Sequence, residues 1–273
     1  MYGTILGDII GSTYEYSEIK RKDFPLFPRG SNITDDSIMA IAVARALLEW
    51  KQDGGDLEVL MASHMQALGQ EYPHPMGAYG VNFNRWLRSR NPEPYYSCGN
   101  GSAMRAGACG LLAKDVAQAL ELAEASAVVT HNHPEGIKGA QATAAAIAMA
   151  KQGCTKEEIR AYIHTFFYPM TRTCDEIRKT YCFEPTCQKT VPEAITAFLE
   201  SVDFEDAIRT TISLGGDADT IGAITGAIAW TYYRAQNGGK LTEAMEQLKA
   251  KAQSYMPRDF IETAEEIDAL AWK

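Results

Sequence analysis

The chain contains 273 residues with a formal net charge of −9, and 46% of its residues are hydrophobic. This length and apolar content suit one domain with a large core, which we expect to span residues 1–273. The acidic balance argues against a nucleic-acid backbone as the main partner. No apolar run approaches the roughly 18 residues of a membrane span. The N-terminus lacks the basic start of a signal peptide, so we expect a cytoplasmic protein with no membrane partner.

Six cysteines occur in the chain without any Cys-x-x-Cys pair. In a cytosolic protein, such cysteines are expected to be reduced and mostly buried. A zinc site that uses Cys182 and Cys187 is the alternative interpretation.

The distribution of apolar residues, caps and breakers predicts helices along most of the chain. Residues 71–101 are rich in proline, glycine and asparagine, which predicts a loop with one short helix. Runs of β-branched residues with a period of two are nearly absent, so we expect an all-α fold, an orthogonal multi-helix bundle. The predicted helices span residues 3–14, 34–50, 57–68, 81–88, the segment that follows 99–105, 117–127, 135–151, 155–163, 191–199, 204–213, 221–230, 241–253 and 258–270.

Gly7 and Gly11 lie four residues apart, on one face of the first predicted helix. A helix face without side chains allows a neighbouring element to approach closely. A basic loop at residues 20–22 and two prolines follow and interrupt regular structure.

Two helix starts carry an unusual number of oxygen-bearing side chains. Residues 213–222 read Ser-Leu-Gly-Gly-Asp-Ala-Asp-Thr-Ile-Gly, in which two glycines predict a tight turn before the helix. Residues 34–37 read Thr-Asp-Asp-Ser, in which Thr34 is a good N-cap. Each start alone is explained by helix capping. Paired carboxylates at the mouth of an apolar helix, with no lysine or arginine beside them, also suit a metal site.

If the two starts converge, their carboxylates need cations. Two unit charges about 4 Å apart repel by roughly 4 kcal/mol at an effective dielectric constant of 20. Two divalent ions would neutralise four carboxylates, and ligands that are all oxygen favour Mg²⁺, Mn²⁺ or Ca²⁺ over zinc. The residues alone leave two interpretations open: two separately capped helices, or one binuclear metal site.

Three further features are candidates for ligand contacts. The sequence Gly99-Asn-Gly-Ser102 at a helix start could hold an anion with its backbone N–H groups, or could be a simple glycine-rich turn. It is neither a P-loop nor a Rossmann fingerprint. His131 and His133 could contact a phosphate or a ribose, or only form surface hydrogen bonds. Glu15, taken alone, is an exposed carboxylate at a helix end.

Taken together, five motifs resemble those of the ADP-ribosylglycohydrolase family. They occur in the family's order and extend over nearly the whole chain. The resemblance implies an orthogonal all-α bundle, a centre with two Mg²⁺ ions that Mn²⁺ could replace, and hydrolysis of the glycosidic bond at C1″ of ADP-ribose. The motifs are Leu6-Gly-Asp-x-x-Gly-Ser-x-Tyr-Glu15, Thr34-Asp-Asp-Ser37, Ser97-Cys-Gly-Asn-Gly-Ser-Ala-Met-Arg105, Thr130-His131 and Gly215-Gly-Asp-Ala-Asp-Thr-Ile-Gly222.

The resemblance also implies roles for individual residues. Glu15 is similar to the glutamate that serves as acid/base residue and gate in the branch that cleaves serine-linked and poly-ADP-ribose. Asp35 and Asp36 are the other candidate catalytic carboxylates. Cys98 stands where that branch often has an aromatic residue, and Ser37 where many members have threonine. The implied metal ligands are Thr34, Asp35, Asp36, Asp217, Asp219 and Thr220, and the implied contacts to ADP-ribose are Ser97, Cys98, Gly99, Asn100, Gly101, Ser102 and His131.

The expected partner is the ADP-ribose moiety of a modified substrate. The acceptor stays open, since serine, arginine, a nucleic-acid base and O-acetyl-ADP-ribose would differ only at the mouth of the cleft. Two other functions are considered: a Mg²⁺-dependent nucleotide phosphohydrolase, because the same oxygens suit phosphoryl transfer, and a non-catalytic ADP-ribose-binding relative. The intact set of carboxylates argues against the non-catalytic alternative.

Overall fold

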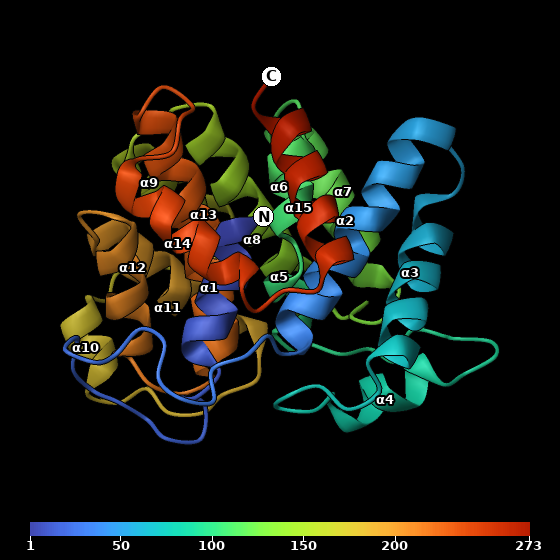
Figure 1. Ribbon diagram of the computed structural model, residues 1–273, viewed down its shortest axis with the longest axis horizontal. Helices are drawn as coiled ribbons and strands as arrows, with labels where there is room; N and C mark the ends of the chain where they lie inside the picture. The colour runs from blue at the N-terminus through green and yellow to red at the C-terminus, as the bar shows by residue number, and fades with distance from the viewer.

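The computed structural model describes residues 1–273, which form fifteen helices and no β-strand (Figure 1). The only strand-like pairings are two isolated bridges, Thr34 with Met76 and Gly99 with Thr186. The predicted all-α fold, an orthogonal multi-helix bundle, is confirmed. The helices are α1 (Tyr2–Gly11), α2 (Asp35–Asp53), α3 (Leu57–Glu71), α4 (Val81–Leu87), α5 (Gly101–Met104), α6 (Gly107–Leu112), α7 (Val116–Val128), α8 (Pro134–Lys151), α9 (Lys156–Phe166), α10 (Cys174–Arg178), α11 (Cys187–Glu200), α12 (Phe204–Ile212), α13 (Ala218–Gln236), α14 (Glu243–Gln253) and α15 (Arg258–Ala271).

The predicted helices differ from the structure in several places. α13 spans Ala218–Gln236 rather than residues 221–230, and α1 ends at Gly11 rather than at residue 14. A turn at residues 105–106 divides the segment after the glycine-rich loop into two short helices, α5 and α6. The sequence analysis missed α10, although Thr173 and Glu176 form a capping box at its start. α11 begins earlier than predicted, at Cys187, and continues through Pro192. A proline removes one intrahelical hydrogen bond, and the burial of α11 against its neighbours offsets that loss.

All six cysteines are free thiols, three of them buried, two half-buried and one, Cys182, exposed. The alternative of a zinc site is wrong. The thiol of Cys187 points inward and donates to the carbonyl oxygen of Gly99 at 3.0 Å, and no group of possible metal ligands includes a cysteine.

α1 and α13 pack backbone against backbone at the centre of the fold (Figure 1). A Cβ atom added to Gly7 would overlap the carbonyl group of Gly222, and one added to Gly11 would overlap that of Ala218. Every residue of α1 and most of α13 is buried. The close packing predicted for the glycine face of the first helix is therefore confirmed, with α13 as its partner.

The buried apolar side chains form one contiguous core of 78 residues, to which both α1 and α13 belong. A single domain over residues 1–273 stays a prediction, and this contiguous core supports it. None of the helices is both long enough and apolar enough to cross a membrane. The C-terminal end of α1 and the N-terminal ends of α2 and α13 lie at the same side of the core, in the lower half of the view (Figure 1).

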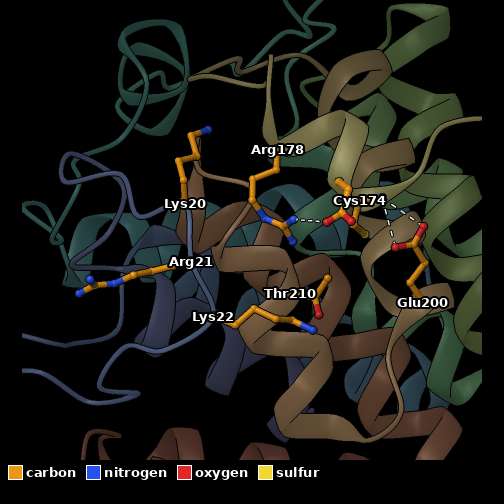
Figure 2. A pocket seen from close by; sticks show the side chains of 8 residues that line it. Lys20, Arg21, Lys22, Cys174, Arg178, Glu200 and Thr210 are labelled. Atoms are coloured by element: carbon orange, nitrogen blue, oxygen red, sulfur yellow. Dashed lines mark hydrogen bonds and ion pairs between the residues drawn. The ribbon is translucent and has the colours of Figure 1, made fainter.

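The turn Gly215–Gly216 leads directly into α13. Its two φ angles, 78° and 77°, lie in the left-handed region that favours glycine, so the predicted tight turn is confirmed. Lys20 Nζ donates to the carbonyl oxygen of Leu214 at 2.5 Å, and Arg178 Nε donates to the hydroxyl of Ser213 at 3.1 Å. Both cationic side chains line a side pocket of about 270 Å³ (Figure 2). These hydrogen bonds therefore hold the chain in place immediately before the carboxylates at the start of α13.

The Gly7→Ala substitution tests the contact between α1 and α13. The added methyl group meets backbone atoms that cannot rotate away, so we expect a loss of about 1–3 kcal/mol in the free energy of unfolding, measured by urea denaturation. Gly80→Ala is the control, because Gly80 has a negative φ and no atom within 4 Å of an added Cβ. Equal stability of the two variants would contradict the close approach.

Candidate active site

One cleft of about 700 Å³ contains most of the predicted site residues. Its walls come from the loop after α1, the start of α2, the segment around α4, the glycine-rich loop (residues 97–102) and the start of α13. The predicted residues that line it are Glu15, Asp35, Asp36, Ser97, Cys98, Gly99, Asn100, Gly101, His131, Asp217, Asp219 and Thr220. Two predicted residues, Thr34 and Ser102, are fully buried behind this wall.

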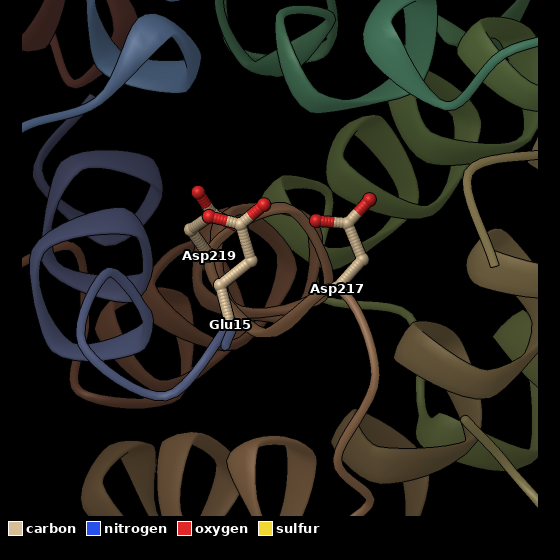
Figure 3. Close-up of side chains that lie close together, drawn as sticks. All are labelled: Glu15, Asp217 and Asp219. Carbon is tan, nitrogen blue, oxygen red and sulfur yellow. The ribbon is translucent and has the colours of Figure 1, made fainter. Parts of the chain in front are cut away.

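Three carboxylates meet at one end of the cleft (Figure 3). Oxygen atoms of Glu15, Asp217 and Asp219 lie within 4.8 Å of one another. Asp217 precedes α13 and Asp219 lies in its first turn, so both extend from the same helix end towards Glu15. No lysine, arginine or histidine forms an ion pair with any of the three.

The starts of α2 and α13 lie side by side. The hydroxyl of Thr220 donates to Asp36 Oδ2 at 3.3 Å, which joins the two helix ends directly. Thr34 caps α2 as predicted, because its hydroxyl oxygen accepts from the Asp36 N–H at 3.2 Å. Asp217 does not cap α13, and its carboxylate accepts from Asn100 Nδ2 at 2.7 Å instead. The alternative of two separately capped helices is therefore wrong for α13.

Asp8, a fully buried carboxylate in the middle of α1, was missed by the sequence analysis. It accepts from the backbone N–H groups of Thr34 and Ser37, at 3.0 Å and 3.1 Å, and from both of their hydroxyls. Burial and the neighbouring charge of Asp219 raise the pKa of Asp8 to about 7. Asp8 thus anchors the start of α2 to the face of α1 that packs on α13. Its signal in the sequence is a single charge within an otherwise apolar helix.

We call Glu15, Asp35, Asp36, Asp217 and Asp219 the acidic cluster. Burial raises the pKa of Asp35, Asp36 and Asp217 well above the usual range, and the charge of Asp219 raises each of them further. The same two causes raise the pKa of Glu15 to about 7.

Three observations fit a bound cation at this cluster. Its carboxylates repel one another, no basic side chain pairs with them, and the buried Oδ1 atom of Asp36 has no hydrogen-bond partner. A divalent cation among the carboxylate oxygens would reduce their repulsion, supply the missing positive charge and give Asp36 Oδ1 a partner. The acidic cluster can therefore hold a metal ion.

The glycine-rich loop forms another wall of the cleft. Its bridge to Thr186 is held by a hydrogen bond from the Asn100 N–H to the carbonyl oxygen of Pro185 at 2.8 Å. Ser97 Oγ accepts from the Gly99 N–H at 3.1 Å. The hydroxyl of Ser102 donates into the interior, to the carbonyl oxygen of Gly136 at 2.7 Å, so only its backbone is available to a ligand.

The two histidines of the predicted pair behave differently. His131 is buried, and its Nδ1 lies 2.6 Å from the hydroxyl of Thr130. Burial lowers the pKa of His131 well below its usual value, so the ring is neutral. His133 Nδ1 accepts from the Glu135 N–H at 3.0 Å and caps α8. His131 lines the cleft, whereas His133 is a capping residue.

Several residues that line the cleft were not predicted, because loop geometry places them there. A Cβ atom on Gly77 would lie 3.3 Å from Glu15 Oε2, so the loop before α4 borders the acidic cluster. Ala78 and Tyr96 are the only residues other than glycine with positive φ, 67° and 55°, and both line the cleft. Arg105 also lines it, although the sequence analysis gave this part of its motif no role.

Comparisons with known proteins agree with this geometry. The family model for ADP-ribosylglycohydrolase matches residues 1–237. The chain is 28% identical to ADP-ribosylhydrolase ARH3 of Gallus gallus and 28% identical to that of Homo sapiens, in each case over 85% of this chain and 83% of the relative. It is 26% identical to ADP-ribosylarginine hydrolase Tri1 of Pseudomonas putida, over 85% of this chain and 69% of the relative.

A solved structure named "ADP-ribosylglycohydrolase-related protein complex" superposes with a TM-score of 0.66. The match covers 99% of this chain and 93% of the other at 24% identity, so the likeness concerns the fold. The family match, in contrast, includes every segment that contributes a carboxylate to the cleft. The chain belongs to the ADP-ribosylglycohydrolase family.

Proposed function

We propose that the protein is a Mg²⁺-dependent hydrolase that cleaves the glycosidic bond at C1″ of ADP-ribose and so removes ADP-ribose from an acceptor. The observation that carries this proposal is the acidic cluster at one end of a cleft that also contains the glycine-rich loop. Relatives named ADP-ribosylhydrolase and ADP-ribosylarginine hydrolase act on ADP-ribosylated substrates, which supports the same substrate class here.

The residues proposed to hold two Mg²⁺ or Mn²⁺ ions are Thr34, Asp35, Asp36, Asp217, Asp219 and Thr220. Thr34 donates its hydroxyl proton to Asp8 at 2.7 Å, which leaves a lone pair on the oxygen for a cation. When bound, the ions supply Lewis-acid chemistry that neutralises the cluster and lowers the pKa of a water molecule.

The proton-transfer role falls to a carboxylate that reaches the open cleft. Glu15 and Asp35 are both partly accessible, whereas Asp36 is buried and held by Thr220. Glu15 or Asp35 therefore fits the general acid/base better than Asp36 does. The remaining carboxylates stabilise the positive charge that develops at C1″ in the oxocarbenium-like transition state.

The glycine-rich loop and His131 are proposed to hold the diphosphate. Gly101 and Ser102 begin α5, where backbone N–H groups lack intrahelical partners and favour an anion. The side chain of Asn100 is occupied by Thr190 and Asp217, so Asn100 links this loop to the acidic cluster rather than contacting phosphate through its amide.

The acceptor would lie at the mouth of the cleft, among side chains from separate segments. Tyr16, Val81, Tyr96 and Phe183 line the cleft and are exposed. Serine, arginine and O-acetyl-ADP-ribose fit the proposal equally, and a nucleic-acid base stays open as an acceptor.

A panel of substrates that carry one ADP-ribose through a defined linkage, namely peptides, O-acetyl-ADP-ribose and a modified nucleic acid, tests this function. With Mg²⁺ present, at least one linkage should release free ADP-ribose, and removal of Mg²⁺ with a chelator should stop the release. Release of AMP or orthophosphate would instead identify a nucleotide phosphohydrolase. Tight ADP-ribose binding without turnover of any linkage would identify a non-catalytic relative.

The Asp35→Asn and Asp217→Asn variants test the role of the two helix starts. Each removes a negative charge from the cluster at almost constant volume, so we expect turnover to fall by at least about 100-fold. Asp53→Asn is the matched control, since Asp53 lies exposed at the opposite end of α2 and has no side-chain hydrogen bond. Wild-type turnover in either cluster variant would contradict the proposed metal mechanism.

Metal binding should also stabilise the folded protein. At a Mg²⁺ concentration about 100 times Kd, linkage predicts a gain of roughly 2.7 kcal/mol, visible as a higher Tm after chelator treatment and Mg²⁺ addition. Protons and Mg²⁺ compete for carboxylates whose pKa is raised, as it is for Asp35, Asp36 and Asp217, so the gain should shrink as the pH falls. Asp219→Asn should abolish the gain, and an undiminished gain in that variant would argue against this site.

A further inference from the structure

Arg105 is a buried cation without a counter-charge. The residue follows α5, is 1% exposed and lines the cleft. No carboxylate forms an ion pair with it. Burial lowers its pKa only to about 10, so the guanidinium stays charged at neutral pH. An unpaired buried charge opposes folding, which makes an apolar residue the expected occupant unless the charge serves a ligand.

The guanidinium uses few of its donors within the protein. Nη2 donates to the carbonyl oxygen of Ser126 at 2.6 Å and to the hydroxyl of Thr130 at 2.8 Å. Nε is buried without any partner. A guanidinium has five N–H donors, so most of its hydrogen-bonding capacity is left unused by the chain.

The contact between Arg105 and Thr130 determines which ring nitrogen of His131 carries the proton. Thr130 is fully buried, and its hydroxyl has two neighbours, Arg105 Nη2 and His131 Nδ1 at 2.6 Å. Arginine can only donate, so the hydroxyl proton has Nδ1 as its sole acceptor. His131 therefore carries its own proton on Nε2.

That Nε2–H points at the glycine-rich loop. A Cβ atom on Gly101 would lie 3.3 Å from His131 Nε2, and one on Gly99 would lie 3.4 Å from it. Nε2 has no hydrogen-bond partner in the protein. It is therefore a free donor directed at the segment proposed to hold the diphosphate.

We propose that Arg105 is a positioning residue for the anionic part of the substrate. Through Thr130 it holds His131 as an Nε2–H donor beside the glycine-rich loop, and its charge balances the anion that binds there. This inference rests on the proposed function for the identity of the anion, a diphosphate. The hydrogen bonds that connect Arg105 to Thr130 and Thr130 to His131 rest on the structure alone.

The first measurement needs no ligand. In protein with ¹⁵N-labelled histidine, NMR spectra at neutral pH should show His131 protonated at Nε2 alone, with its signals identified by their loss in His131→Gln. Thr130→Val and Arg105→Met should lose this single tautomer, and Thr130→Ser, which keeps the hydroxyl, should retain it. A wild-type ring protonated at Nδ1, or a tautomer unchanged in Thr130→Val, would contradict the proposed hydrogen-bond chain from Arg105 through Thr130 to His131.

The second measurement is the affinity for ADP-ribose, by calorimetry with Mg²⁺ present. Without Arg105, the hydrogen bond from His131 Nε2–H to the diphosphate should be lost. Loss of a hydrogen bond to a charged group lowers affinity about tenfold or more, and we expect this loss of affinity in Arg105→Met. Arg105→Lys, which keeps the charge, should bind more tightly than Arg105→Met. Arg90→Met is the matched control, because Arg90 is exposed and forms no ion pair or hydrogen bond, and it should bind as the wild type does.

Stability separates this role from a structural one. Arg105→Met removes an unpaired buried charge, so it should keep a Tm near that of the wild type while it loses affinity. If every variant that loses affinity also has a lower Tm, or if Arg105→Met binds ADP-ribose as the wild type does, the proposal is wrong. If the wild type itself does not bind ADP-ribose, the proposed function fails and the role towards the diphosphate fails with it. The NMR measurement of the His131 tautomer then still decides whether the hydrogen-bond chain from Arg105 through Thr130 to His131 exists.

Discussion

The contact between α1 and α13 is the constraint on which the site depends. Glycine against glycine lets the two backbones approach more closely than side chains would allow. The approach sets Asp8 close enough to Asp219 for their charges to interact, and Asp8 in turn holds the start of α2 through four hydrogen bonds. Two helix starts that are distant in sequence are thereby brought to one point by a carboxylate that does not itself line the cleft. The site is thus built on the centre of the fold, which is what precise positioning of the proposed metal ligands requires.

The acidic cluster concentrates negative charge that the protein does not neutralise. Natural proteins usually pair buried carboxylates, because an unpaired buried charge opposes folding. Here the nearby lysine and arginine side chains, Lys20 and Arg178, bind the backbone and hydroxyl before the turn instead of the carboxylates after it. The charge is therefore left available to an external cation. Some folding stability is given up for this, as is common at functional sites.

Local signals account for what the sequence could predict. Thr34 as an N-cap, the Gly215–Gly216 turn and most helix spans follow from residues that are adjacent in the chain. The same signals could not reveal Asp8 or Arg105, because their importance comes from partners far along the chain or from the lack of any. The motif resemblance identified the family and the segments of the site. It did not distinguish Ser102, whose hydroxyl faces the interior, from loop residues that line the cleft, since that difference depends on packing against Gly136.

Two kinds of unpaired charge lie in one cleft, and under the proposed function they would impose an orientation on the substrate. Carboxylates without cations lie around the starts of α2 and α13, and a guanidinium without an anion lies behind the glycine-rich loop and His131. Asn100 donates from the loop to Asp217 and so links the two ends of the cleft. Under the proposed function, a ligand with a phosphate-bearing part and a hydroxyl-rich part would satisfy both ends only in one direction, with its phosphates at the loop and its ribose at the acidic cluster. In that orientation, electrostatics would direct the C1″ atom to the acidic cluster before any contact with the acceptor is made.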